Sequence, residues 1–95
     1  MRMMMKARMD TQMSNQATAG GAMPASVKSA IEQLKPEAAY FTPEGGRTMF
    51  LVFDMQDSSQ LPAIADPLFQ EMGAEVTFEP VMNLDELQRG LAALR

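Results

Sequence analysis

Six polar side chains are the candidates for binding or catalysis in this chain. They comprise an ammonium, a guanidinium, a phenol, a hydroxyl and two carboxylates, on Lys6, Arg8, Tyr40, Thr42, Asp54 and Glu79. Lys6 and Glu79 could position an anionic ligand and accept a proton, and Tyr40 could donate a proton or a hydrogen bond to a ligand oxygen. Because the six residues form no motif of fixed spacing, they are candidates for ligand binding, and no catalytic residue is assigned.

Four of these candidates also have purely structural explanations. A cross-strand ion pair would account for Lys6 and Glu79, and we favour it. Tyr40 fits the wet edge of an interface, with its ring packed and its hydroxyl in water. Asp54 could line a pocket, or it could end its strand and pair with Arg2.

The composition argues against several kinds of site. The chain has no histidine and no cysteine, so the usual general base, the usual zinc ligands and a thiolate nucleophile are missing. The net charge of −4 argues against a nucleic-acid partner. The methionine-rich residues 1–9 could suggest copper(I), but no Met-x-x-Met repeat supports it, and core packing is the better explanation. We therefore expect no metal and no other cofactor.

The same N-terminal stretch bears on location. Its apolar residues are interrupted by Lys6 and Arg8, which is unlike a signal peptide. No apolar run approaches the roughly 18 residues of a membrane helix. We expect a cytoplasmic protein with no membrane partner.

The most apolar stretch, residues 46–55, predicts a β-strand around which the other elements are arranged. Alternation places Leu51 and Phe53 on one face and Phe50 and Val52 on the other. Both faces are apolar at the centre, so we expect both to be covered. Helices can cover one face, and we expect a second copy of the chain to cover the other.

Further strands are expected at residues 1–9, 37–42 and 75–82, where apolar and polar side chains alternate. Capping residues mark the starts of three helices: Asp10, then Asp57 with Gln60, then Asn83 with Glu86. The first helix is expected to run to about residue 19 and the second from 24 to 35. A kink is expected at Pro67 in the third helix.

Two features of this pattern leave alternatives open. Gly20 and Gly21 form a break between two helices, or a flexible lip beside a cavity. The last helix carries a leucine stripe, which we expect to pack on its own sheet edge or on a partner chain. That stripe consists of Leu84, Leu87, Leu91 and Leu94.

The order β-α-β-β-α-β followed by a helix is the ferredoxin-like α+β pattern. It predicts a single domain over residues 1–95, with both main helices on one face of a four-stranded antiparallel sheet of order 4-1-3-2. The helix-covered face would carry Met3, Met5, Phe41, Leu51, Phe53, Val76 and Phe78. The opposite face, which we call the open face, would carry Met4, Lys6, Arg8, Tyr40, Thr42, Thr48, Phe50, Val52, Asp54, Thr77 and Glu79. An apolar centre with a polar margin is typical of a small pocket or a wet interface.

Three segments of the chain resemble a group of small uncharacterised bacterial proteins of the dimeric α/β-barrel superfamily. The segments are LKPEAAYFT, GRTMFLVFDMQDSSQLPAIADPLF and GAEVTFEPVMNLDEL. The resemblance implies a homodimer in which two sheets pack face to face around a cavity. The superfamily includes muconolactone isomerase-like enzymes, cofactor-free monooxygenases, haem proteins and ligand-sensing domains. Because this chain has no histidine, we transfer the fold and the dimer but no catalytic residue.

Two classes of function remain. We favour a homodimer that binds a small apolar molecule with a phenolic or anionic head in the barrel cavity, without a metal or a nucleotide. The alternative is a small cofactor-free enzyme, an isomerase or a monooxygenase-like protein, that uses the same cavity. The missing histidine favours the binding protein.

Overall fold

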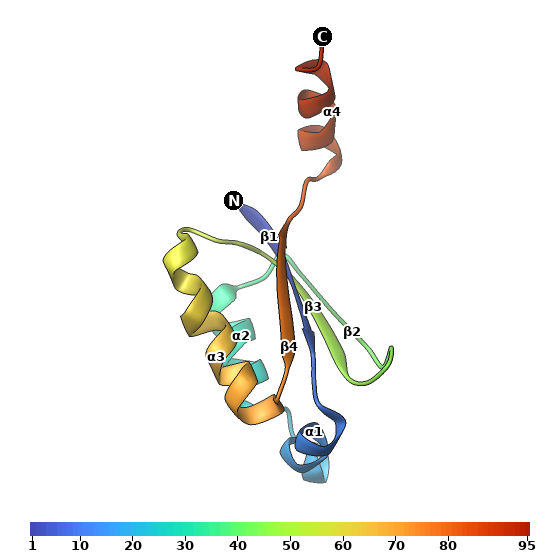
Figure 1. The fold of residues 1–95 in the computed structure, drawn as a ribbon, viewed down its shortest axis with the longest axis vertical. Coiled ribbons are helices and arrows are strands. Elements are labelled where there is room, and N and C mark those ends of the chain that lie inside the picture. Colours follow the sequence, from blue (N-terminus) through green and yellow to red (C-terminus); the bar gives the residue numbers. More distant parts are fainter.

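The computed structural model describes all 95 residues and contains one four-stranded sheet (Figure 1). Its strands are β1 (Arg2–Arg8), β2 (Ala38–Thr42), β3 (Thr48–Asp54) and β4 (Glu75–Pro80). The strands run antiparallel in the order β2-β3-β1-β4, which reads 4-1-3-2 from the β4 edge. The α+β class and the four-stranded antiparallel sheet are therefore confirmed.

Four helices accompany the sheet. They are α1 (Thr11–Ala17), α2 (Ala25–Leu34), α3 (Leu61–Met72) and α4 (Leu84–Ala92), with short 3-10 turns η1 (Ala19–Gly21) and η2 (Ser58–Gln60). Helices α2 and α3 cover one face of the sheet, α1 lies at one end, and α4 projects beyond the other (Figure 1). The open face is bare in the single chain.

The helix starts follow the capping residues read from the sequence. The Asp10 carboxylate accepts a hydrogen bond from the Met13 backbone N–H at 3.0 Å. Asp57 with Gln60 opens η2, and Asn83 with Glu86 opens α4, each as a reciprocal capping box. The first helix ends at residue 17, earlier than expected, because a 3-10 turn replaces its last residues. Helix α3 continues through Pro67.

The core lies between the sheet and the helices. On β3, Leu51 and Phe53 are almost fully buried, and Leu68 of α3 packs into the same cluster. Met3 and Met5 of β1 belong to it too, so core packing is the role of these methionines. On the open face, Phe50 and Val52 are only half-buried.

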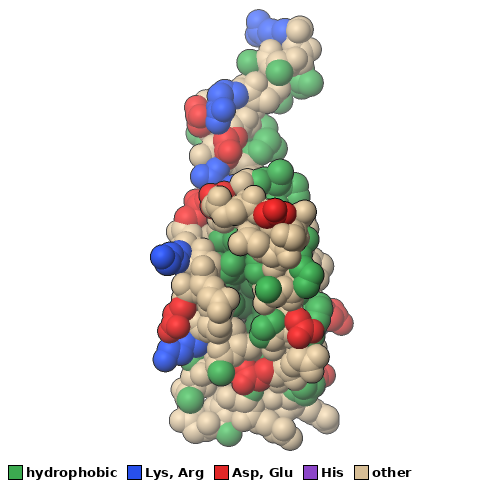
Figure 2. Space-filling model, turned by 90° about the vertical axis from the view of Figure 1, so that its left-hand side faces the viewer, with side chains coloured by type: hydrophobic (Ala, Val, Ile, Leu, Met, Phe, Trp, Pro, Cys, Tyr) green, Lys and Arg blue, Asp and Glu red, His purple; other side chains and the backbone are tan.

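Of the two surfaces considered for the leucine stripe of α4, its own sheet edge was wrong. Residues 81–83 carry the chain past the end of the sheet, and Leu84 and Leu94 are 70% and 81% exposed. Figure 2 shows the helix standing clear of the body. Its orientation is set at its base, where the Arg2 guanidinium pairs with Glu86 of the capping box. The leucine stripe is therefore presented to solvent by an anchored helix.

Candidate functional site

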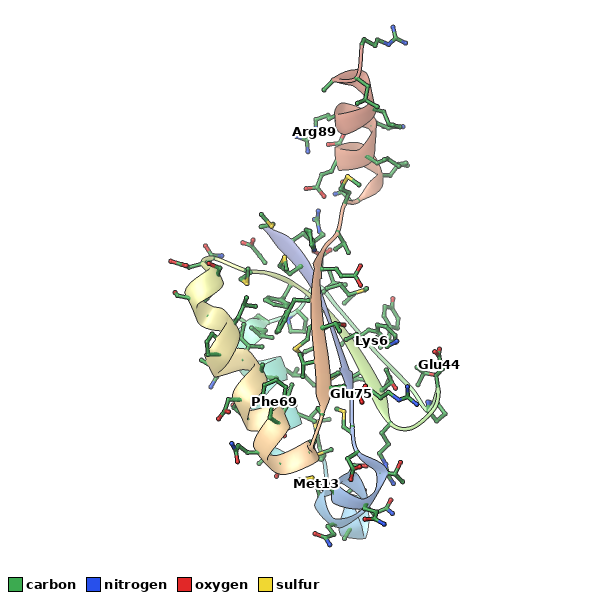
Figure 3. All side chains as sticks on the ribbon, in the orientation of Figure 1. Lys6, Met13, Glu44, Phe69, Glu75 and Arg89 are labelled. Atoms are coloured by element: carbon green, nitrogen blue, oxygen red, sulfur yellow. The ribbon has the colours of Figure 1, made fainter.

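The open face brings two of the sequence candidates into one row across the sheet. Lys6 lies opposite Phe50 of β3 and Thr77 of β4, and Tyr40 lies opposite Phe50 on its other side. The Lys6 ammonium is 5.7 Å from the centre of the Phe50 ring, a cation–π contact. Lys6 points to the side of the sheet away from α2 and α3 (Figure 3). An ammonium and a phenol thus flank an aromatic ring, which suits an apolar ligand with a polar head.

The cross-strand ion pair between Lys6 and Glu79 is not formed. Glu79 lies opposite Met4, two residue pairs further along the strands, and no ion pair includes either charge. The ammonium contacts the Phe50 ring instead. The favoured structural explanation of this pair was therefore wrong, and its role in ligand binding stays a prediction.

Two other candidates hold the backbone in place. Arg8 Nη2 donates a hydrogen bond to the Gly45 carbonyl at 2.7 Å. Gly45 has a φ of +66°, in the left-handed region, so this position in the hairpin favours glycine. Asp54 pairs with the N-terminal amine at 2.8 Å, and this hydrogen bond lowers the pKa of its carboxyl. Although Arg2 lies opposite Asp54, it pairs with Glu37 and Glu86.

A cavity lies on the other side of the sheet, and we call it the helix-side pocket. Its volume is about 510 Å³, within the usual range for small-molecule sites. The lining residues come from the ends of β1 and β2, the start of β3, the α1–α2 link, α2 and α3. They are Met9, Thr18, Gly21, Ala22, Met23, Pro24, Val27, Phe41, Thr42, Pro43, Arg47, Thr48, Met49 and Met72. Of the six sequence candidates, only Thr42 lines it. Thr42 and Thr48 were both expected on the open face, and both line this pocket instead.

The floor and the rim of this pocket differ in exposure. On the floor, Met9, Val27 and Met49 are buried. At the rim, Met23 and Phe41 are 55% and 56% exposed. We expected Phe41 to pack against the helices; it is on their side of the sheet, but it lies on the edge strand β2 and is not covered. A partly uncovered apolar rim around a buried apolar floor is suited to hold an apolar molecule.

Two glycines shape the lip of the pocket. Gly20 and Gly21 have φ values of +79° and +82°, in the left-handed region that favours glycine. They separate α1 from α2, and Gly21 lines the cavity. Both readings of this pair, as a helix break and as a lip beside a cavity, fit the structure.

Arg47 is the charged residue of the lining, and the sequence analysis missed it. Its Nη1 donates hydrogen bonds to Ser14 Oγ at 2.6 Å and to Asn15 Oδ1 at 2.9 Å, both on α1. Its Nε and Nη2 make no hydrogen bond, and none of the four ion pairs includes it. The one signal in the sequence was its position just after the Gly45–Gly46 turn. The guanidinium therefore keeps free donors at a mostly apolar cavity.

The chain matches one known protein family. The model of the family described as "Domain of unknown function (DUF3303)" matches residues 1–95, the whole length of this chain. The chain belongs to this family. A comparison of this DUF3303 chain with curated proteins found no match.

Two further observations bear on what the DUF3303 site could hold. No three acidic side chains lie close enough together to hold a metal ion. No helix has both the length and the apolar character needed to cross a membrane. The helix-side pocket and the open-face row each bring apolar and polar groups together.

An ion-dipole contact holds the two helices beside the pocket together. The Glu71 carboxylate of α3 accepts hydrogen bonds from the Ser26 hydroxyl at 2.5 Å and from the Ser26 backbone N–H at 2.8 Å. These bonds hold the pKa of Glu71 below its ordinary value. Ser26 is in the first turn of α2, so the contact ties the C-terminal turn of α3 to the start of α2.

We expect Ser26→Ala to raise the pKa of Glu71 towards its ordinary value of about 4.3. Because the folded pKa is depressed, the contact stabilises the protein above that value, and the effect is lost as pH falls through the folded pKa. At pH 7 the variant should lose about 1 kcal/mol, and in acid much less. An NMR titration of the Glu71 carboxyl and melting curves at both pH values measure this. Ser29→Ala on the same helix is the control, and an unchanged Glu71 pKa would refute the contact.

Proposed function

We propose that this DUF3303 protein is a homodimer that binds a small molecule with an apolar body and a phenolic or anionic head, without a metal or a nucleotide. The helix-side pocket is the observation that carries the proposal. A ligand there would cover the exposed parts of Met23 and Phe41 and contact the buried floor. Burial of apolar surface contributes about 25 cal/mol per Å².

The dimer rests on two apolar surfaces that a single chain leaves uncovered. The first is the centre of the open face, where Met4, Phe50 and Val52 are half-buried. The second is the leucine stripe of α4, which projects beyond the body (Figure 1). Face-to-face packing of two ferredoxin-like sheets would cover the centre of the open face. The leucine stripe of α4 would pack on the partner chain. Such an interface should bury about 800 Å² per chain.

The open-face candidates form a second possible binding place in such a dimer. Lys6, Tyr40 and Glu79 would lie at the margin of the space between the two sheets. Arg8 and Asp54 would lie further towards the ends of the strands, whereas Thr42 lines the helix-side pocket. The cation–π contact of Lys6 with Phe50 supports a site for an aromatic head group there.

A thermal-shift screen of phenols and aromatic or aliphatic acids tests the proposal. A ligand at 100 times its dissociation constant should stabilise the protein by about 2.7 kcal/mol. Ala22→Trp, which places an indole at the rim of the helix-side pocket, should abolish the shift. Ala19→Trp, in the same link but outside the lining, should preserve it.

The outcome of the screen also separates the two places. Loss of the shift in Tyr40→Phe but not in Ala22→Trp would move the site to the space between the sheets. Absence of any shift would refute small-molecule binding. Formation of a product from a bound compound would assign the protein to the cofactor-free isomerase or monooxygenase class instead.

A further inference from the structure

We propose that the helix-side pocket selects monocarboxylates with an apolar body, and that Arg47 binds the carboxylate. This inference rests on the proposed function, since it names the class of ligand for the same pocket. The inference goes beyond the proposed function because it assigns the ligand's charged group to a specific residue. The sequence candidates for an anionic head group, Lys6 and Arg8, are not in this lining.

The first argument is the unmatched charge of Arg47. Arg2 and Arg89 form ion pairs with carboxylates, whereas Arg47 contacts only the neutral oxygens of Ser14 and Asn15. Those two bonds use Nη1 and hold the guanidinium in position against α1. The donors on Nε and Nη2 remain free, and an arginine fork with free donors suits a planar carboxylate.

The second argument is the composition of the rest of the lining. No aspartate or glutamate is among the lining residues, so an anion would meet no like charge there. The other polar side chains are hydroxyls of Thr18, Thr42 and Thr48, and the Thr48 hydroxyl already donates within its own turn. One cation beside an apolar cavity matches one anionic group on an apolar body.

The third argument concerns the shape of that body. Met9, Met49 and Met72 contribute flexible thioether side chains to the floor, and such side chains adapt to irregular ligands. The rim residues Met23 and Phe41 are open to solvent. An unbranched chain or a small aromatic ring could enter at this rim with its carboxylate left at Arg47.

The test compares decanoate with decanol, a neutral molecule of the same chain length, by calorimetry below the micelle concentration. Wild-type protein should bind decanoate about tenfold more tightly than decanol, and added salt should reduce this preference. Arg47→Gln should bind decanoate and decanol equally. Its affinity for decanol should be unchanged, and this serves as the control that the pocket is still folded. Arg47→Lys should restore part of the preference, and Lys28→Gln, on the solvent side of α2, should keep all of it.

The possible failures are distinguishable. If neither compound binds to the wild type, the proposed function fails together with the inference. If both bind with equal affinity, or if Arg47→Gln keeps the preference for decanoate, the pocket binds apolar molecules but Arg47 does not select a carboxylate.

Discussion

Replacement of Val52 by glutamate is expected to convert the proposed dimer into folded monomers. Val52 lies at the centre of the open face, directly opposite Met4 on β1 and Ala38 on β2. In a single chain it is half-exposed, so a carboxylate there can reach water. Between two sheets it would be buried without a partner, which costs several kcal/mol for each charge. Because the dimer has two such positions, the penalty applies twice.

Sedimentation at micromolar concentration measures this change. Wild-type protein should sediment at twice the 10.4-kDa mass of the chain, and the Val52→Glu variant at the mass of one chain with an unchanged circular dichroism spectrum. Gln70→Glu, on the exposed side of α3, adds the same charge outside the interface and should remain dimeric. A wild-type monomer, or a dimeric Val52→Glu variant, would contradict the face-to-face dimer.

Truncation of the leucine stripe should have the second large effect. Leu87 and Leu91 are 40% and 54% exposed in the single chain, so they contribute little to its own stability. If the partner buries them, each change to alanine should cost about 2–5 kcal/mol of dimer stability. This corresponds to a dissociation constant about 30-fold to several thousand-fold larger.

The effect should depend on protein concentration, because it concerns association. Dilution series followed by sedimentation or melting would show it. Arg89→Ala changes the opposite side of α4, where Arg89 forms an exposed pair with Asp85 at 3.1 Å, and should change stability by less than about 1 kcal/mol. Equal effects of Leu91→Ala and Arg89→Ala would mean that the stripe has no partner in the dimer.

Local chemistry explains why much of the fold was predictable from the sequence. A side chain such as Asn83 or Asp57 caps the backbone next to it, so the helix start depends on a few neighbouring residues. The alternation along β3 similarly assigned Leu51 and Phe53 to the helix-covered face without any knowledge of distant contacts.

The position of α4 and the exposure of Phe41 could not be predicted in this way. The leucine stripe of α4 shows that the helix needs an apolar surface, but not which one, since residues 81–83 direct it away from its own sheet. Phe41 alternates like a core residue, yet it lies on edge strand β2, and the helices do not extend over it.

The candidate site was the least predictable part. Arg47 reaches the helix-side pocket only because the hairpin turn brings it against Ser14 and Asn15, which are 33 and 32 residues earlier. No periodic pattern in the sequence predicts that contact. The open-face candidates were placed on the correct strands. The cavity, however, lies on the helix side of the sheet, between the α1–α2 link and β2.

NMR of methyl-labelled methionine tests the central claim, binding in the helix-side pocket, most directly. Met9, Met23, Met49 and Met72 line that pocket, whereas Met4 lies on the open face and Met82 lies beside α4. On titration with decanoate, the four lining methyl signals are predicted to shift together, with those of Met4 and Met82 unchanged. A shift of Met4 alone, or no shift at the four lining methionines, would contradict a binding site on the helix side of the sheet.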